Sequence, residues 1–381
     1  MIYGSRVRQA RELRGMPQGE LAAALGKSPS WLTKLETSDS SATVNHDALD
    51  VLSARLLMPA DFFTAPIPEE LGDGSMRFRA RKRMTKGSLA AVRRRAELAH
   101  EIAHVVLQHV DAPSARVPSL RATTNIEEAA QQTRAALSIP PDAVIPRLWN
   151  SIERAGIFVY AMEDAADGLL DAFSTWTGPA LERPIIAISE HRSWDRVRHT
   201  AAHELGHLVL HRSASYDPSG GLDVEQDANR FAGAFLFPRD AALEELPRPL
   251  TLARLAPLKL RWGMSLGALV FRALELGVID SGRAASLHRQ IGVRGWRTRE
   301  PGADAREPEK PRALRKMVEL VYGTPPDARG LARHVRRYTA DVTRELDRYA
   351  TPPVGRRPAP RVPDGPAHSG GRVVFLSSRK T

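Results

Sequence analysis

Cysteine is absent from the 381 residues of this chain. Its absence excludes disulfide bonds and thiolate metal sites, so histidine, aspartate and glutamate are the side chains left to hold a metal ion. The sequence also lacks an apolar run long enough to span a membrane, and its first residues, MIYGSRVRQARELRG, lack the apolar stretch of a secretory signal. We therefore expect a cytoplasmic protein without a membrane partner.

Positive charge is in excess but unevenly distributed. The net charge of +11 favours an acidic partner such as nucleic acid. Residues 1–63 carry seven charges of each sign, whereas residues 283–381 hold 22 basic and 10 acidic side chains. A basic block at 77–95 has nine positive residues and no negative one, so it is either a solvated linker and helix face or a nucleic-acid contact.

The chain is too long for one hydrophobic core, so two domains with appendages are expected. Composition and Pro/Gly breakers predict a helical N-terminal domain, a basic linker with a helix, a larger domain, a helical extension and a disordered basic tail. The predicted boundaries of these five parts are, in order, 1–65, 66–124, 125–300, 301–350 and 351–381.

Inside the larger domain the spacing of apolar residues changes between that of helices and that of strands. Short segments rich in β-branched and aromatic residues predict a small sheet at 157–162, 169–176 and 184–189. The apolar spacing predicts helices before and after them, at about 87–110, 125–139, 146–156, 194–211, 223–236 and 266–277.

One apolar stripe at helical spacing crosses the C-terminal extension. It predicts a helix over 329–349, along which lie Leu331, Val335, Tyr338, Val342, Leu346 and Tyr349. Packing on its own domain is favoured over a dimerisation coiled coil, because the stripe barely reaches three heptads.

Residues 18–36 have the pattern of a helix-turn-helix. A helix beginning at Gln18 would bury Leu21, and Gly26 permits the turn into a second helix that Ser28 caps. The side chains placed to contact DNA are Gln18, Ser28, Ser30, Trp31, Thr33 and Lys34.

This segment resembles the Xre/Cro family of helix-turn-helix domains. The matching residues, in order, are Gln18, Leu21-Ala22, Leu25-Gly26, Ser28, Leu32 and Leu35-Glu36, and 48–63 is similar to the last two of that family's five helices. The resemblance implies phosphate contacts from the Gln18 end and base reading by the second helix, usually as a homodimer on a double-stranded DNA operator. TSDSS at 37–41 departs from the usual Asn-Gly turn. The alternative is a small helical domain that makes protein contacts alone.

The sequence His203-Glu204-Leu205-Gly206-His207 is an HExxH motif within a helical pattern. Four residues advance a helix slightly more than one turn, so both imidazoles project from the same face and can converge on one zinc ion. Glu204 lies beside them, where it can take a proton from a bound water.

A zinc hydrolase needs a third protein ligand and an open position for water. Glu225 and Asp227 are the candidates downstream. Glu225 is favoured, because it shares a helical face with small and polar residues. His199 and His211 also follow the four-residue spacing, but each such step rotates about 40°, so they are expected to lie beside the site rather than in it.

These residues resemble the ImmA/IrrE family of metallo-endopeptidases. The HELGH helix, the pattern Glu225-x-x-Ala228-Asn229-x-Phe231-Ala232 and Leu236-Phe237-Pro238 match that family, whereas Gly233 stands where Ala is frequent. The resemblance implies that His203, His207 and Glu225 bind one Zn²⁺ per chain and that Glu204 is the catalytic base. The expected fold class is therefore multidomain and mainly α: a five-helix helix-turn-helix domain, then an α+β zincin-like domain with a small sheet and an HExxH helix.

The function expected is zinc-dependent peptide hydrolysis joined to DNA binding and transcription regulation. Zinc would lower the pKa of its water toward about 7 while Glu204 carries the proton to the leaving amine. The resemblance implies a helix-turn-helix repressor as the protein substrate, and the strand at 184–189 is a candidate to pair with it. The alternatives are a non-catalytic transcriptional regulator and an antitoxin that uses the larger domain for sensing or partner binding.

Overall fold

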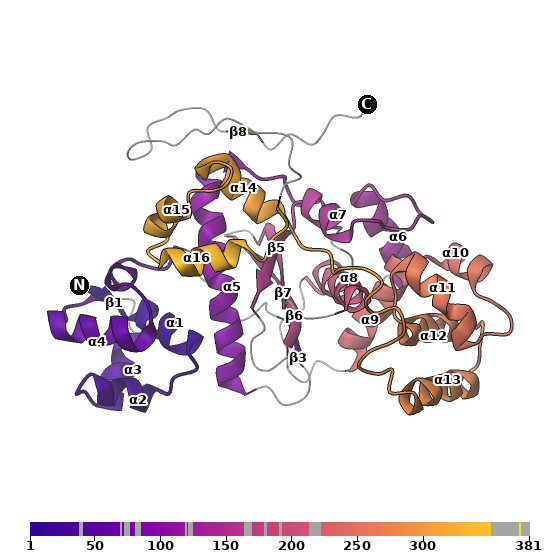
Figure 1. The fold of residues 1–381 in the computed structure, drawn as a ribbon, viewed down its shortest axis with the longest axis horizontal. Helices are drawn as coiled ribbons and strands as arrows, with labels where there is room; N and C mark the ends of the chain where they lie inside the picture. Colours follow the sequence, from indigo (N-terminus) through magenta and orange to yellow (C-terminus); the bar gives the residue numbers. More distant parts are fainter. Residues whose placement is uncertain are drawn as a thin grey trace.

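The chain folds into a mainly helical structure around a small central sheet (Figure 1). The computed structural model describes residues 1–37, 41–68, 71, 77–80, 85–118, 120, 125–163, 170–178, 181–189, 193–212, 222–351 and 373–374. Among the helices of these residues, none is long and apolar enough to cross a membrane. The helix-turn-helix end and the helices that follow the sheet lie at opposite ends of Figure 1.

The N-terminal region has the five helices that the sequence predicts, the fifth of them a 3-10 helix. They are α1 (Gly4–Leu13), α2 (Gln18–Ala24), α3 (Pro29–Thr37), α4 (His46–Leu56) and η1 (Ala60–Thr64). The two-residue strands β1 (Ile2–Tyr3) and β2 (Ser41–Ala42) pair beside them. Apolar side chains from these helices, including Leu21, Leu32 and Phe62, form a separate core. Residues 38–40, most of the predicted departure at TSDSS, lie outside the described residues.

The central sheet has four strands in the order β3-β6-β7-β5. The three predicted segments form β5 (Phe158–Met162), β6 (Leu170–Thr177) and β7 (Arg183–Ser189). Strand β3 (Arg77–Ala80) comes from the basic block and was not predicted, because its four residues are too few for their alternation to indicate a strand within a run of basic residues.

Strand β7 occupies an internal position. It pairs with β5 in parallel and with β6 in antiparallel register, so its backbone hydrogen-bonding groups are taken on both sides. The expectation that 184–189 pairs with an extended substrate is therefore wrong.

One face of the sheet packs against the predicted metal helix and its neighbours. The helices on this side are α6 (Ile126–Ala136), α7 (Leu148–Arg154), α8 (Trp194–Leu210) and α9 (Leu222–Leu236), followed by α10 (Arg239–Glu245), α11 (Leu252–Trp262), α12 (Leu266–Glu275) and α13 (Ser281–Val293). The predicted helices at 125–139, 146–156, 194–211, 223–236 and 266–277 are confirmed within a few residues. Their apolar faces join the sheet in the largest core of the molecule.

The other face of the sheet is covered by α5 (Lys86–Leu107) and by the C-terminal extension. The extension consists of α14 (Ala313–Tyr322), α15 (Ala328–His334) and α16 (Thr339–Leu346), and with α5 and β5 it forms a second core. The single helix predicted over 329–349 is wrong, because Arg336 adopts a left-handed φ of 52° that ends the helical path. The stripe is nevertheless buried within its own chain, except for Tyr338, which is 44% exposed.

The tail predicted as disordered, 351–381, lies almost wholly outside the described residues. Two of its residues form β8 (Val373–Val374), which pairs in parallel with β4 (Val110–Asp111) at the end of α5.

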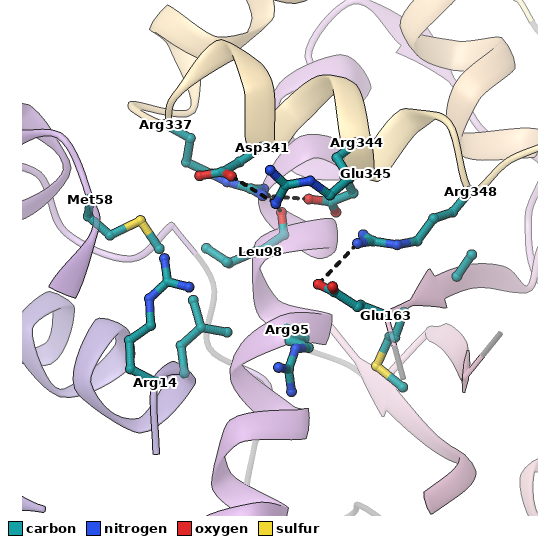
Figure 2. A pocket seen from close by; sticks show the side chains of 13 residues that line it. Arg14, Met58, Arg95, Leu98, Glu163, Arg337, Asp341, Arg344, Glu345 and Arg348 are labelled. Carbon is teal, nitrogen blue, oxygen red and sulfur yellow. Dashed lines mark hydrogen bonds and ion pairs between the residues drawn. The ribbon is translucent and has the colours of Figure 1, made fainter. Parts of the chain in front are cut away.

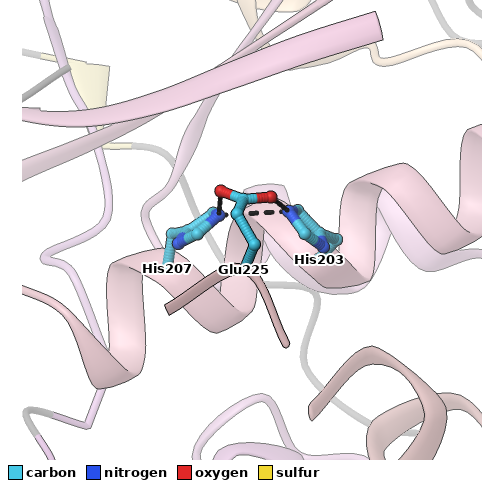
Figure 3. Close-up of side chains that lie close together, drawn as sticks. All are labelled: His203, His207 and Glu225. Carbon is cyan, nitrogen blue, oxygen red and sulfur yellow. Dashed lines mark hydrogen bonds and ion pairs between the residues drawn. The ribbon is translucent and has the colours of Figure 1, made fainter. Parts of the chain in front are cut away.

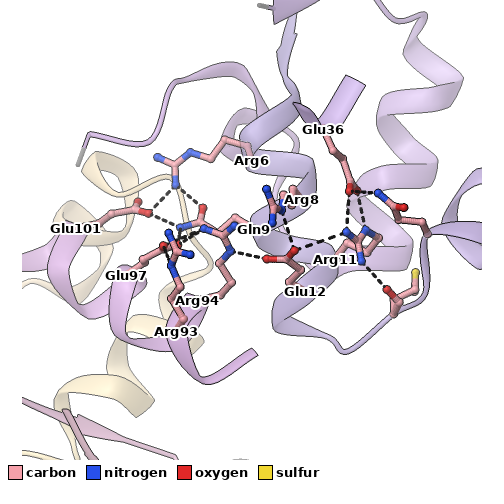
Figure 4. A network of polar contacts seen from close by, with 12 residues as sticks. Arg6, Arg8, Gln9, Arg11, Glu12, Glu36, Arg93, Arg94, Glu97 and Glu101 are labelled. Carbon is pink, nitrogen blue, oxygen red and sulfur yellow. Dashed lines mark hydrogen bonds and ion pairs between the residues drawn. The ribbon is translucent and has the colours of Figure 1, made fainter. Parts of the chain in front are cut away.

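A buried polar network joins the helix-turn-helix region to the long helix α5 (Figure 4). Arg6 of α1 pairs with Glu101 at 2.7 Å, and both side chains are almost fully buried. Gln9 donates to Glu97 and to Glu101, while Arg94 reaches back to Glu12 at 2.8 Å. The first helix is thus held to α5 by charge-assisted hydrogen bonds as well as by apolar packing.

Candidate metal centre and nucleic-acid interface

The candidate metal centre lies where α8 and α9 pack closely together. Gly206 makes this approach possible, since a Cβ there would lie 2.9 Å from Cδ1 of Phe231 on α9. Helix α8 is buried along most of its length, and His203 is fully buried. The close packing brings Glu225, near the start of α9, to the same point as the histidines.

His203, His207 and Glu225 converge on one position (Figure 3). The two Nε2 atoms are 3.0 Å apart. Carboxylate oxygens of Glu225 lie 3.3 Å from Nε2 of His203 and 3.2 Å from Nε2 of His207. A tetrahedral ion about 2.0–2.1 Å from each ligand atom would separate those atoms by roughly 3.3 Å. The donor set and its spacing therefore fit a zinc-sized cation, and among the described residues this is the one such group.

Glu225 is the most accessible member of the group. Its side chain is 49% exposed, whereas the side chain of His203 is buried. Burial raises the pKa of the Glu225 carboxyl, but hydrogen bonds and charge from the two histidines outweigh burial and hold the pKa well below its usual range. The carboxylate is thus charged and open to solvent on one side, which leaves room for a further ligand.

Glu204 points from α8 toward the sheet. It is fully buried, and its Oε2 accepts a hydrogen bond of 2.7 Å from the hydroxyl of Ser174 on β6. This contact fixes the orientation of the carboxylate. Ser174 was not foreseen from the sequence, because a single serine within a strand carries no signal of its own.

Two further side chains contact the Nδ1 atoms of the imidazoles, on the side away from the ligand position. Oδ1 of Asn229 lies 3.1 Å from Nδ1 of His203, and Nδ1 of His211 lies 3.1 Å from Nδ1 of His207. When Nε2 of each ring faces a cation, Nδ1 carries the proton and donates it to such a partner, which fixes the tautomer and the ring plane. His211 thus lies beside the site and outside the ligand group, as the helical geometry predicts.

The other candidate metal ligands that the sequence offered are not part of this group. Asp227 lies on the same helix as Glu225, with its carboxylate 4.0 Å from Arg230, and His199 lies one turn before His203 on α8.

At the other end of the molecule, α3 presents a polar surface. Ser30, Thr33 and Lys34 are exposed, and Trp31 is half-buried with Lys27 over its ring. Ser28 caps the helix as predicted, since its Oγ accepts from the backbone N–H of Trp31 at 3.2 Å. The face expected to enter a major groove is therefore open to solvent.

Gln18 has a different environment from the other candidates. Its side chain donates to Glu36 at 2.8 Å and accepts from Thr33 at 3.3 Å, so it connects α2 to α3. Glu36 in turn forms a two-bond ion pair with Arg11, at 2.6 and 2.7 Å. Neither this buried pair nor its role in holding α3 was predicted.

The comparisons with known proteins bear on both regions. Residues 152–274 match the peptidase family model described as the IrrE N-terminal-like domain, and residues 7–46 match the helix-turn-helix family. A search of curated proteins finds no match. The first range contains the sheet strands β5 to β7 and the His203, His207 and Glu225 group. Both resemblances found in the sequence are confirmed: the chain carries a helix-turn-helix DNA-binding domain and a peptidase domain of the IrrE N-terminal-like family.

Proposed function

We propose that the chain is a DNA-binding regulator whose larger domain is a zinc-dependent endopeptidase. The observation that carries this proposal is the convergence of His203, His207 and Glu225 next to a buried, oriented Glu204. Two imidazoles and one carboxylate with an open side are the ligands of many catalytic zinc sites, whereas structural sites are usually closed by four protein ligands.

Each residue has a distinct role in this proposal. Zn²⁺ at the site would supply Lewis acidity toward a peptide carbonyl and toward water. Glu204 accepts a proton from the attacking water and delivers it to the amine nitrogen that leaves. Ser174 keeps the Glu204 carboxylate directed at the reacting atoms, and Asn229 and His211 keep the rings in place. The products are a new carboxylate and a new amine.

The substrate we propose is a helix-turn-helix repressor, so that cleavage would relieve repression in the cytoplasm. Support comes from the domain pairing, since a DNA-binding domain in the same chain would bring a protease to a promoter. The exposed face of α3 would read the operator, as a homodimer on paired half-sites, with Ser30, Thr33 and Lys34 nearest the bases. Lys34→Ala should lower operator affinity, as measured by fluorescence anisotropy, while Glu20→Ala should not.

The experiment for the peptidase compares wild type, His203→Ala and Glu204→Gln by elemental analysis and by incubation with repressors from the same genome. One zinc in wild type and in Glu204→Gln, less in His203→Ala, and cleavage by wild type alone are the expected results. No zinc in wild type, even after reconstitution, would reject the proposal.

The second candidate function is a regulator that binds zinc without cleaving protein, or an antitoxin that binds a toxin through the larger domain. The 49% exposure of Glu225 is compatible with a site that recognises a partner. Zinc bound at one per chain, with no cleavage of any repressor by wild type, would favour this alternative.

A further inference from the structure

Two cavities adjoin at the end of strand β5, away from the metal centre. The smaller, of about 90 Å³, lies between the helix-turn-helix region, α5 and α16 (Figure 2). Five arginines and three carboxylates line it, which leaves a surplus of two positive charges. Its volume suits the head group of a small anion and is too small for a larger ligand.

The carboxylates of this basic cavity are already engaged with arginines of the C-terminal helices. Glu345 pairs with Arg337 at 2.7 Å, Asp341 with Arg344 at 3.3 Å, and Glu163 with Arg348 at 3.3 Å. Two further observations indicate unused positive charge.

Arg14 supplies the first of them. Its guanidinium donates to the backbone carbonyls of Leu56 and Leu57, at 3.0 and 3.1 Å, and it forms no ion pair with a carboxylate of the described residues. The second is Arg337, whose buried Nε has no hydrogen-bond partner although its other nitrogens contact Glu345 and the carbonyl oxygen of Leu98. A bound anion would compensate the positive charge that the three carboxylates do not cancel.

The larger cavity, of about 550 Å³, is mainly apolar. It lies beyond the carboxyl ends of the parallel strands β5 and β7, the position at which open sheets commonly bind ligands. Trp149, Ile188 and Val197 provide apolar walls. Ser189, 2% exposed, also lines it, and its Oγ has no hydrogen-bond partner. A volume in the range of small-molecule sites, mostly apolar with one unsatisfied hydroxyl, is typical of a binding pocket.

Ala161 and Arg348 line both cavities, so the apolar space and the basic space share a wall at these residues. We propose that the two cavities form one binding site for a small amphipathic anion, with an apolar body against Trp149 and Val197 and a carboxylate or phosphate head among the arginines. The side chain of Arg348, 14% exposed, lies at the junction and would contact the head group.

The position of the site suggests what its ligand would influence. The basic cavity has walls from the DNA-binding region, Arg14 and Met58, and the apolar cavity has a wall from α8, Val197, two turns before the HExxH motif. One ligand would therefore contact both functional halves of the chain. The binding experiment below does not depend on peptidase activity, so its result is separate from that of the proposed function.

The test is calorimetric titration of the full-length chain with octyl phosphate, octanoate, hexyl phosphate, inorganic phosphate and octanol. We expect octyl phosphate or octanoate to bind at least tenfold more tightly than inorganic phosphate or octanol, because neither of the latter fills both cavities. Each buried methylene adds roughly fourfold in affinity, so octyl phosphate, with two more methylenes, should exceed hexyl phosphate by about 15-fold. The stronger of the two octyl compounds identifies the head group.

Variants locate the site. Arg344→Gln and Arg14→Gln should each weaken binding of the stronger octyl compound by roughly tenfold, since each removes a charged donor. Arg333→Gln, an exposed arginine on α15 outside both cavities, is the matched control and should bind as wild type does. Equal affinity for octyl phosphate and inorganic phosphate, equal affinity for octyl phosphate and octanol, or wild-type binding by both cavity variants would each overturn the proposal.

Discussion

The hydroxyl of Ser174 donates a 2.7 Å hydrogen bond to Oε2 of Glu204, and through it the sheet orients the candidate base. Ser174 lies on β6, which pairs with β7 on one side and β3 on the other, so its position is fixed by backbone hydrogen bonds. Both side chains are buried, and a hydrogen bond in such a place is stronger than one in water.

Ser174→Ala should reduce kcat for peptide cleavage by roughly 10- to 100-fold with little change in KM, since a charge-assisted hydrogen bond contributes about 1.5–3 kcal/mol. Zinc content should stay at one per chain, because the ligand group is His203, His207 and Glu225. Ser174→Thr retains the hydroxyl and should recover most of the activity. A kcat equal to wild type in Ser174→Ala would show that Glu204 needs no such support.

Asn229→Ala should weaken zinc binding by 10- to 100-fold, the usual cost of losing a partner of a metal-binding histidine. The reason is geometric: Oδ1 of Asn229 fixes the ring of His203 at 3.1 Å. Competition with a chromophoric chelator measures the affinity. Gln226→Ala, an exposed change on the same helix, is the control and should bind zinc normally. Equal zinc affinity in both variants would assign Asn229 to packing alone.

The metal ligands of the candidate centre could be predicted where residues close in sequence share one face of a helix. His203 and His207 lie four residues apart on a helix, and helical geometry alone places both on one face. Glu225 required a second helix, whose apolar period was also visible in the sequence. Ser174 was not predictable, because its role depends on which strand pairs beside α8.

Several features of the fold left no local signal. Strand β3 forms by backbone pairing, which an arginine-rich segment neither favours nor forbids. The break at Arg336 is a left-handed turn at a residue other than glycine, and such turns cannot be distinguished by hydrophobic period. Glu300 and Glu309 look like charges in a solvated linker. In the structure they accept backbone N–H groups at the starts of α12 and α7.

Two helical glycines near the centre should respond oppositely to alanine. A Cβ at Gly233 would meet side-chain atoms of Arg272 and Glu275 at 3.5 Å, an ordinary contact, so Gly233→Ala should stabilise the fold by about 0.5–1 kcal/mol through helix propensity. A Cβ at Gly206 would lie 2.9 Å from Phe231, so Gly206→Ala should destabilise. Urea unfolding measures both. Stabilisation by Gly206→Ala would contradict the close packing of α8 on α9.

The contact between α1 and α5 can be tested at Glu101. Glu101→Gln leaves the buried Arg6 guanidinium without its charge partner, and removing one member of a buried pair costs about 3–5 kcal/mol. Thermal unfolding should show this loss. Arg8→Ala is the matched control on α1, since Arg8 pairs with Glu12 in a more exposed setting and its removal should cost under about 1 kcal/mol. Equal effects from the two variants would indicate that the buried network does not hold the helix-turn-helix region in place.

Glu153 should make stability depend on pH near neutrality. Burial raises the pKa of Glu153 to about 7, although the backbone N–H groups of Arg312 and Ala313, each 2.8 Å from its Oε1, oppose that shift. Glu309 adds a nearby negative charge that raises the pKa further. The folded chain therefore binds this proton more tightly than the unfolded chain, whose glutamate titrates near 4.5.

Between about pH 4.5 and 7 the folded state holds more protons at Glu153 than the unfolded state, so the free energy of unfolding contributed by this group falls as pH rises. The full effect is roughly 3 kcal/mol, from a shift of about 2.5 pKa units at 1.36 kcal/mol each. Glu153→Gln cannot titrate and should remove this slope. Chemical unfolding of wild type and variant at a series of pH values measures the difference between them. If the two curves run parallel from pH 5 to 8, Glu153 is ionised in the folded chain and the hydrogen bonds from Arg312 and Ala313 outweigh its burial.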